Sequence, residues 1–171
     1  MPITFMLADG IRVTEGLDAL RRRPGMYLGP CAVEHGYGAG LVEIALDSIV
    51  NDTPAPTAVR LTLWRAREIT IAFDGEPLPI HPVGVDGISH PALYSLFLHL
   101  THARRSFPHA GCRLNALSEK LIVSTVVDGA RYWAGFSRGG LVSLLRKAGN
   151  DVEPLGTTWL TFLPDPSLIP E

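Results

Sequence analysis

Apolar residues recur at helical spacing in four stretches of the chain, and each stretch predicts a helix. Leu17 and Leu20 share one face of the first, whose arginines fall in its last turn, where positive charge suits the helix dipole. In the second stretch the apolar positions go almost all the way round, so we expect this helix to be buried. The expected helices cover residues 15–23, about 37–50, 90–103 and about 111–118.

Alternating apolar and polar residues predict strands, mostly in the last third of the chain. Two hairpins are expected to turn at Asp128-Gly129 and Gly139-Gly140, and the stretch 74–87, rich in proline and glycine, is expected to be a loop. The expected strands cover 57–64, 69–73, 121–127, 131–137, 141–146 and 158–163. Because helices and antiparallel hairpins are segregated, we predict an α+β fold, a two-layer sandwich.

Composition and charge fit a globular chain with an N-terminal arm at residues 1–14 and one domain at 15–171. Hydrophobic residues make up 46% and charged residues 19%, a balance that excludes a disordered chain. The net charge of -2 gives no basic footprint, so we expect no DNA contact on this ground. Arg21-Arg22-Arg23 forms a basic cluster, for which a solvated helix end is the simpler interpretation than a binding patch.

The cysteines Cys31 and Cys112 lie far apart without metal-ligand spacing, which favours a reduced, cytoplasmic setting. We see neither a leader peptide nor an apolar stretch of the roughly 18 residues that span a bilayer, and expect a soluble protein without membrane contact.

Two other residue types carry candidate chemistry. His99, His102 and His109 could form a metal site, but histidines on a helix surface explain the pattern better. Core or interface aromatics, rather than a platform that stacks bases, are expected at Trp64, Trp133 and Trp159. We expect no metal ligand set.

Residues 21–29 read Arg-Arg-Arg-Pro-Gly-Met-Tyr-Leu-Gly, a run long enough to be specific. Further landmarks follow in order: Glu43 on the second helix, Asp74-Gly75 with Pro79 and residues 80–82, residues 115–118 before a strand, and residues 156–165. Together they resemble the ATPase domain of the B subunits of bacterial DNA gyrase and topoisomerase IV, over nearly the whole chain. The resemblance implies the GHKL (Bergerat) fold, with helices on one face of a mixed, mostly antiparallel sheet and the nucleotide between the layers.

The resemblance assigns Glu43 the position of the general base that activates water for attack on the γ-phosphate. Four residues later the family has an asparagine that holds Mg²⁺, and this chain has Asp47. Since residues at i and i+4 share a helix face, we expect two carboxylates in one buried site, one of them with a raised pKa.

The loop after the second strand departs furthest from the family's adenine site. Phe73 stands where an aspartate accepts a hydrogen bond from the adenine amino group, Asp74 and Gly75 match, and Glu76 and Pro77 replace an arginine and a glycine. Phenylalanine cannot accept that bond, and an unpaired polar group costs about 1–3 kcal/mol.

The family's phosphate cradle is a glycine-rich lid that opens a helix, whose backbone N–H groups hold the phosphates. Here residues 107–113 lead almost directly to Asn115, and Gly111 is the one glycine among them. Thr157 or Thr158 corresponds to a threonine near the adenine. Where the family has an arginine after the first hairpin turn, Trp133 stands, with Arg131 close by. With the chain ending at Glu171, we expect the transducer domain and its lysine to be absent.

Three functions follow as hypotheses from this pattern. The first is a degenerate, non-catalytic domain, a pseudoenzyme that binds ATP weakly or not at all and associates with a protein partner or a second copy through its arm, using Ile3–Leu7. The second is a divergent ATPase that uses Glu43, with Asp47 and Asp74 around Mg²⁺. The third, by analogy alone, is a regulator that mimics gyrase. No cofactor is expected under the first hypothesis, and ATP with Mg²⁺ under the second.

Overall fold

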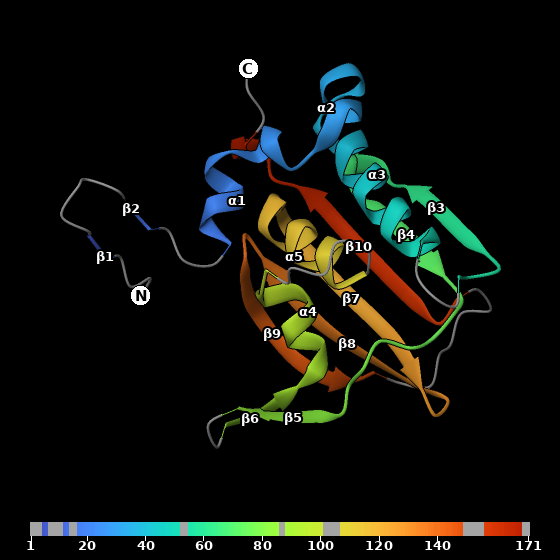
Figure 1. The fold of residues 1–171 in the computed structure, drawn as a ribbon. Coiled ribbons are helices and arrows are strands. Elements are labelled where there is room, and N and C mark those ends of the chain that lie inside the picture. Colours follow the sequence, from blue (N-terminus) through green and yellow to red (C-terminus); the bar gives the residue numbers. More distant parts are fainter. Residues whose placement is uncertain are drawn as a thin grey trace.

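The computed structural model describes residues 5–6, 12–13, 17–51, 55–85, 88–100, 107–148 and 156–168. Within these ranges a six-stranded sheet carries helices on one face (Figure 1). The strands, in spatial order, are β3 (Val59–Leu63), β4 (Ile69–Phe73), β10 (Thr158–Pro164), β7 (Ser118–Val127), β8 (Ala130–Ser137) and β9 (Gly140–Lys147). The predicted α+β two-layer sandwich is therefore confirmed. Neighbouring strands of this sheet all pair antiparallel, so the mixed sheet of the expectation is antiparallel in the described part.

The two hairpins of the last third turn on residues with left-handed backbone. Asp128 and Gly129 have φ of 50° and 72°, and Arg138 and Gly139 have φ of 48° and 90°. Two successive positive φ values match the right-handed twist of the flanking strands, which is why aspartate and glycine suit the first turn. The second turn was predicted one residue too late: Gly140 already belongs to β9.

Each predicted helical region contains an α-helix. The helical elements are α1 (Asp18–Arg22), η1 (Pro24–Met26), α2 (Gly29–His35), α3 (Tyr37–Val50), η2 (Arg65–Arg67), α4 (Ala92–Leu98), α5 (Phe107–Leu117) and η3 (Pro166–Leu168). Helix α5 begins earlier than predicted, and α2 and the short 3-10 helices η1, η2 and η3 are additional. Sequence reasoning missed α2, since Gly29-Pro30 looked like a break although proline is accepted in a first helical turn. Among the described residues, none of the helices has the length and apolar run needed to traverse a bilayer.

The predicted loop at 74–87 and the predicted helix at 90–103 are both wrong in part. A small hairpin, β5 (Pro82–Val85) with β6 (Ile88–Pro91), lies between them. Helix α4 begins only at Ala92, because Pro91 keeps an extended ψ of 134°. His99, after its end, has extended backbone, and His102 lies outside the described residues.

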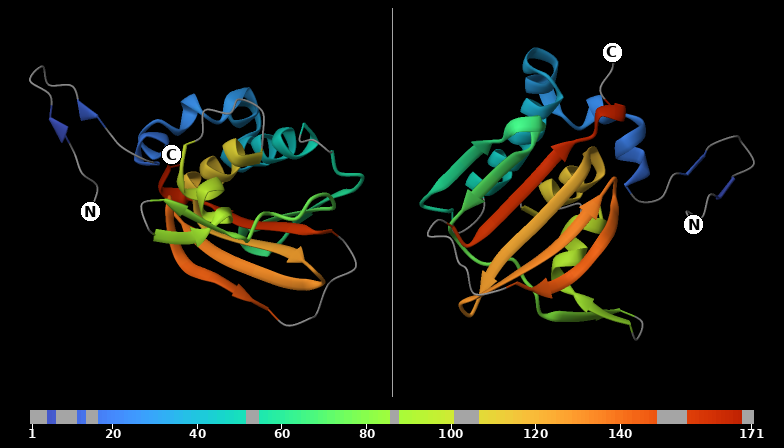
Figure 2. Two further views of the ribbon diagram at one scale, coloured as in Figure 1. Left: turned by 60° about the horizontal axis from the view of Figure 1, so that its bottom comes forward. Right: turned by 180° about the vertical axis from the view of Figure 1, so that it is seen from behind.

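The core lies between the sheet and helices α3, α4 and α5. Leu41 of α3, Phe97 of α4 and Leu114 of α5 are fully buried, as are Ile71 and Leu160 at the centre of the sheet. Burial of such side chains contributes roughly 1.5–3 kcal/mol each. The sheet thus has an inner face that packs on the helices and an outer face turned away from them (Figure 2, right).

An ion pair joins α1 to the end of the last strand. Arg21 Nη2 lies 2.7 Å from Asp165 Oδ2, and Arg21 Nη1 donates to the Ala116 carbonyl at 2.7 Å. The interpretation of the arginine cluster as a solvated helix end is therefore wrong for Arg21. It fits Arg22 and Arg23, which are exposed.

The N-terminal arm is described only at Phe5–Met6 (β1) and Arg12–Val13 (β2), which pair with each other. Figures 1 and 2 show these two strands to one side of the six-stranded sheet. The rest of the apolar run Ile3–Leu7 lies outside the described residues.

Candidate functional site

Helix α3 carries Glu43 and Asp47 one turn apart, and both side chains are exposed. The buried face of α3 is formed by Leu41, Ile44 and Ala45, so the two carboxylates lie on the stripe that faces away from the core. The expected buried carboxylate pair is therefore wrong, because the apolar positions of α3 do not enclose it. Asp47 is engaged at the helix end, where Asn51 Nδ2 donates to its carbonyl at 2.7 Å and to its Oδ1 at 2.8 Å.

Phe73 ends β4 with its side chain in the core. It is 8% exposed and shares the inner face with Ile71, while its backbone pairs with Val59 and Thr158. The Thr157 N–H donates to the Phe73 carbonyl at 2.8 Å. Gly156 has φ of +94°, and a Cβ there would come within 2.9 Å of the same carbonyl oxygen, so only glycine suits this close approach. The backbone just before β10 therefore lies in close contact with the end of β4.

Asp74 binds the segment that leads into β3. Its carboxylate accepts a hydrogen bond from the Thr57 hydroxyl and another, of 2.7 Å, from the Ala58 N–H. The hydrogen bond from Thr57, followed by that from Ala58, lowers the pKa of Asp74 below its ordinary value. The next three residues, Gly75, Glu76 and Pro77, are exposed.

A buried polar cluster lies beside Phe73, and sequence reasoning missed part of it. Thr158 and Thr125 are cross-strand partners, 0% and 1% exposed, with their hydroxyls 3.5 Å apart. The Thr125 hydroxyl accepts a hydrogen bond from the Leu78 N–H at 2.9 Å. Of the two threonines predicted near the adenine, Thr158 therefore turns inward and Thr157 contributes backbone hydrogen bonds. Thr125 occupies an alternating inward position like any apolar residue, so nothing in the sequence marked it.

Gly111 and Asn115 hold α5 to its neighbours. A Cβ at Gly111 would come within 2.7 Å of the Leu96 carbonyl oxygen, so this glycine lets α5 pack closely on α4. Asn115, 0% exposed, donates from Nδ2 to the Phe97 carbonyl at 2.9 Å and accepts from the Gly139 N–H at 3.1 Å. Both residues match the predicted phosphate region in sequence position, and both are engaged in packing.

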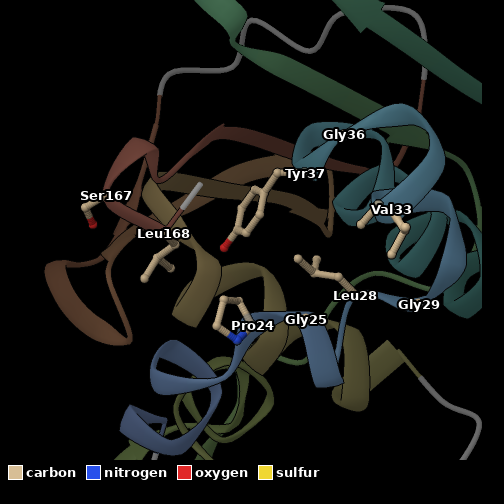
Figure 3. A pocket seen from close by; sticks show the side chains of 10 residues that line it. Pro24, Gly25, Leu28, Gly29, Val33, Gly36, Tyr37, Ser167 and Leu168 are labelled. Carbon is tan, nitrogen blue, oxygen red and sulfur yellow. The ribbon is translucent and has the colours of Figure 1, made fainter. Parts of the chain in front are cut away.

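A cavity of about 710 Å³ opens beside α2 (Figure 3). Leu28, Val33 and Leu168 line it, and Tyr37 contributes its ring while its hydroxyl donates to the Leu117 carbonyl at 3.2 Å. Burial, and secondarily the charge of Asp165, raises the pKa of Tyr37 well above its ordinary value. The predicted site residues Glu43, Asp47, Phe73 and Asp74 do not line this cavity.

The predicted site residues are thus only partly together. Phe73 and Thr158 are register partners, and Asp74 follows Phe73 at the sheet margin, whereas Glu43 and Asp47 lie on the exposed stripe of α3. In the described part of the chain, His, Cys, Asp and Glu side chains form no group of three or more that could hold a metal ion.

Comparison with known proteins gives a consistent set of relatives, although no family model matches the chain. The chain is 32% identical to the B subunit of DNA topoisomerase 4 from Streptococcus pneumoniae, an alignment that covers 94% of this chain and 26% of that protein. It is 30% identical to the B subunit of DNA gyrase from Thermus thermophilus over 94% of this chain and 27% of that one. The chain therefore spans about a quarter of the length of these curated relatives.

A solved structure is similar as well. The 43K ATPase domain of Thermus thermophilus gyrase B, in complex with an aminocoumarin, superimposes with a TM-score of 0.72 and 27% sequence identity. The match covers 90% of this chain and 40% of that chain. Sequence and fold similarity therefore point to the same region of these larger proteins.

Proposed function

Because this chain is a relative of the ATPase domain of the DNA gyrase and topoisomerase IV B subunits and shares its GHKL fold, we propose that it keeps this scaffold without a working nucleotide site. It acts instead through association with another protein or a second copy. The observation that carries the proposal is the burial of Phe73 at the position where the family binds adenine.

Phe73 removes the adenine anchor in two ways. Its ring has no acceptor for the adenine amino group, and the unpaired donor costs about 1–3 kcal/mol. The ring is also a packed part of the core, beside Ile71 and the Thr125–Thr158 pair. A purine that took this space would have to displace the ring from its core packing.

The remaining nucleotide positions support the same proposal. Asp74 is bound by Thr57 and Ala58, and Gly111 is used in the contact of α5 with α4. Asp47 offers a carboxylate in place of the amide that holds Mg²⁺ in the family, and adds negative charge next to a triphosphate. These residues therefore do not fit a nucleotide with its metal, and we derive no hydrolytic step from them.

Exposed apolar side chains support the association role. Edge strand β3 leaves one side of its backbone unpaired in the sheet order, and Val59, Leu61 and Leu63 on it are 39%, 45% and 71% exposed. Such an edge can pair with another chain. Near the cavity beside α2, Met26 and Val33 are 70% and 87% exposed.

Calorimetric titration of the full chain with ATP and Mg²⁺ tests the nucleotide part of the proposal. We expect no heat of binding at ligand concentrations of about 100 μM, which corresponds to a standard free energy weaker than about -5.5 kcal/mol. A dissociation constant in the low micromolar range would overturn it. The association part is tested by the molar mass in solution: we expect a dimer that dissociates when residues 1–14 are removed, and a monomer in both forms contradicts the arm as the dimer contact.

One observation favours a second candidate, a divergent ATPase. Glu43 is exposed on α3 at the family's general-base position, and in the described part of the chain it makes no ion pair. This candidate predicts phosphate release from ATP that is lost in Glu43→Gln and kept in the matched variant Glu34→Gln, another exposed helical glutamate. Absence of turnover in the unaltered chain, alone and with a captured partner, counts against it.

A further inference from the structure

The outer face of the six-stranded sheet carries a row of side chains that runs across all six strands. Paired residues of neighbouring strands share a face, and the pairings Arg60–Ala72, Ala72–Trp159, Trp159–Ser124, Ser124–Trp133 and Trp133–Arg146 follow one another from β3 to β9. With about 4.8 Å between strands, the two arginines at its ends are roughly 24 Å apart and the two tryptophans roughly 10 Å. We call this set the outer row.

Arginine side chains stack on both tryptophans of the outer row. The Arg146 guanidinium lies 4.4 Å from the ring centroid of Trp133, and the Arg131 guanidinium lies 4.6 Å from that of Trp159. The third tryptophan of the chain, Trp64, is on the same face: it is 56% exposed, and its Nε1 donates to the Thr70 hydroxyl at 2.9 Å. The outer face therefore gathers every tryptophan of the chain, so of the two expected roles, core or interface aromatics, the core role is wrong.

The charge of this face is positive, unlike that of the chain as a whole. Lys120 is paired with Glu68 at 2.9 Å, and Asp74, at the margin, is bound by Thr57 and Ala58. The other cations of these rows are three arginines without a carboxylate in ion-pair distance among the described residues: Arg60 and Arg146, which are exposed, and Arg131, whose Nε and Nη2 are buried. Two of them are held on rings, so their positive charge is fixed in place.

The surface next to the outer row, which we call the floor, is rich in hydroxyl groups. The adjacent row of paired residues consists of Thr62, Thr70, Thr161, Ile122, Gly135 and Ser143. Thr70 and Thr161 hydroxyls lie 3.0 Å apart, so part of this floor is already hydrogen-bonded. In the view from behind, no described helix crosses this face (Figure 2, right).

We propose that the outer face binds single-stranded nucleic acid. Flat bases stack on the exposed Trp64 ring and on the exposed Arg146 guanidinium, whose other side lies on the Trp133 ring, and the phosphates between them are matched by Arg60 and Arg146. A double helix presents its bases edge-on and buried, so it would leave the rings unused. The net charge of -2 argued against nucleic acid only as an average over the whole chain, and strand register places the exposed Arg60 and Arg146 on this one face. This binding is independent of the nucleotide positions around Phe73.

The test is a fluorescence titration of the full chain with an oligothymidylate of about 16 nucleotides. We expect tryptophan quenching on binding, and a slope of log affinity against log salt of about -1.4, since two phosphate contacts contribute about -0.7 each. The double variant Arg60→Ala/Arg146→Ala should weaken binding at least about tenfold and bring the slope close to zero. The matched control Arg22→Ala/Arg23→Ala removes two exposed arginines elsewhere and should leave both quantities unchanged.

Competition separates this proposal from its nearest rival, an acidic protein segment on the same face. A polyglutamate of equal length should bind more weakly and should not quench the tryptophans, because it has no rings to stack. Equal binding of polyglutamate, equal binding of a duplex, loss of affinity in the Arg22/Arg23 control, or no binding of the oligothymidylate each overturns the proposal. Because all four altered residues are surface arginines, circular dichroism should confirm that the variants keep the fold.

Discussion

The two ends of β10 use buried polar groups in different ways. At its C-terminal end the fully buried Asp165 is surrounded by donors: Arg21 at 2.7 Å, Arg138 at 2.9 Å, and the hydroxyl and N–H of Ser167 at 2.8 and 3.0 Å. At its N-terminal end, Thr158 has only a 3.5 Å contact with Thr125, and Phe73 fills the adjoining space. At the first end a buried carboxylate is hydrogen-bonded by several donors. At the second end a phenylalanine ring packs beside two buried hydroxyls.

This difference fits our proposal that the chain keeps the scaffold without a working nucleotide site. Arg21, Asn115 and Asp165 lie in segments that resemble the family, and here each has a structural role that other residues depend on. Phe73, which we propose departs from the family, packs in the core, whereas Glu76 and Pro77, for which we propose the same, are exposed. Residues that stabilise the scaffold are constrained by folding, whereas residues that would contact only a ligand are not.

The largest effect on the difference between the two ends of β10 is expected from a substitution at Asp165. Asp165→Asn should lower the free energy of unfolding by about 3 kcal/mol, since the variant leaves Arg21 without its charged partner in a partly buried setting. Urea unfolding at pH 7 measures this. The control Glu34→Gln alters an exposed carboxylate and should change stability by less than about 0.5 kcal/mol. Equal effects of the two substitutions would mean that the cluster adds nothing to the fold.

The contribution of Asp165 to the free energy of unfolding should also depend on pH. Burial alone would raise the pKa of Asp165, but hydrogen bonds from Arg138, Arg21 and Ser167 outweigh it and hold this pKa far below its ordinary value. A depressed folded-state pKa stabilises the fold above the unfolded-state value, near 3.9, and this contribution disappears as the pH falls through the folded-state value. The stability difference between the wild type and Asp165→Asn should therefore shrink below about pH 4. A difference independent of pH contradicts the assignment.

The next largest loss of stability is expected from a substitution at Gly111. Gly111→Ala should destabilise the chain by about 2 kcal/mol, because the new methyl group would press on the Leu96 carbonyl and the Phe97 ring. The matched control is Gly38→Ala on α3, where the nearest atom would lie at 3.7 Å, and there we expect no loss, or a gain of up to about 1 kcal/mol from helix propensity. If both variants unfold at the same urea concentration, Gly111 is not a packing residue.

A smaller effect is expected at the apolar end of β10. Thr125→Val should cost about 1–2 kcal/mol, since it leaves the buried Leu78 N–H without an acceptor. Thr158→Val, which keeps that bond, should cost less than about 0.5 kcal/mol, because 3.5 Å is a weak contact. The reverse order of the two variants in thermal unfolding would show that Thr158 is the anchor of this cluster.

The smallest effect is expected at the sheet margin. Asp74→Asn keeps the shape of the side chain but removes the charge that strengthens its hydrogen bonds from Thr57 and Ala58. We expect a slight loss of thermal stability at neutral pH that fades in acid, since the pKa of Asp74 is depressed in the fold. A variant that unfolds at the wild-type temperature throughout would assign no role to the charge.

Much of the sheet could be predicted, because its strands alternate strictly. The strand at 69–73 and the turn at Asp128-Gly129 agree with the structure residue for residue. Helix α2 and the β5–β6 hairpin were missed, since Gly29-Pro30 and Pro82 look like breaks to local propensity, which does not see the neighbours that hold them. Register, and with it the outer row, depends on strand order, and local patterns do not contain that information.

The site was harder to predict than the sheet. Sequence reasoning took the apolar richness of α3 as burial on all sides, but helical spacing already puts Glu43 and Asp47 on one stripe, which the structure leaves exposed. That Phe73 departs from the family's adenine site stays a prediction, and its place in the core follows from its inward position on β4. The hydrogen bond from Leu78 to Thr125 joins residues 47 apart in sequence and could only be seen in three dimensions.

The ion pair between Arg21 and Asp165, which we call the clasp, has a mechanical consequence. It links residues 144 positions apart, at the first helix of the domain and just beyond its last strand. A pulling force applied to these two places loads the ion pair first and reaches the strands only after it has broken. In single-molecule stretching, the chain should therefore yield in two steps, a short extension as the clasp opens and a larger one as the sheet comes apart.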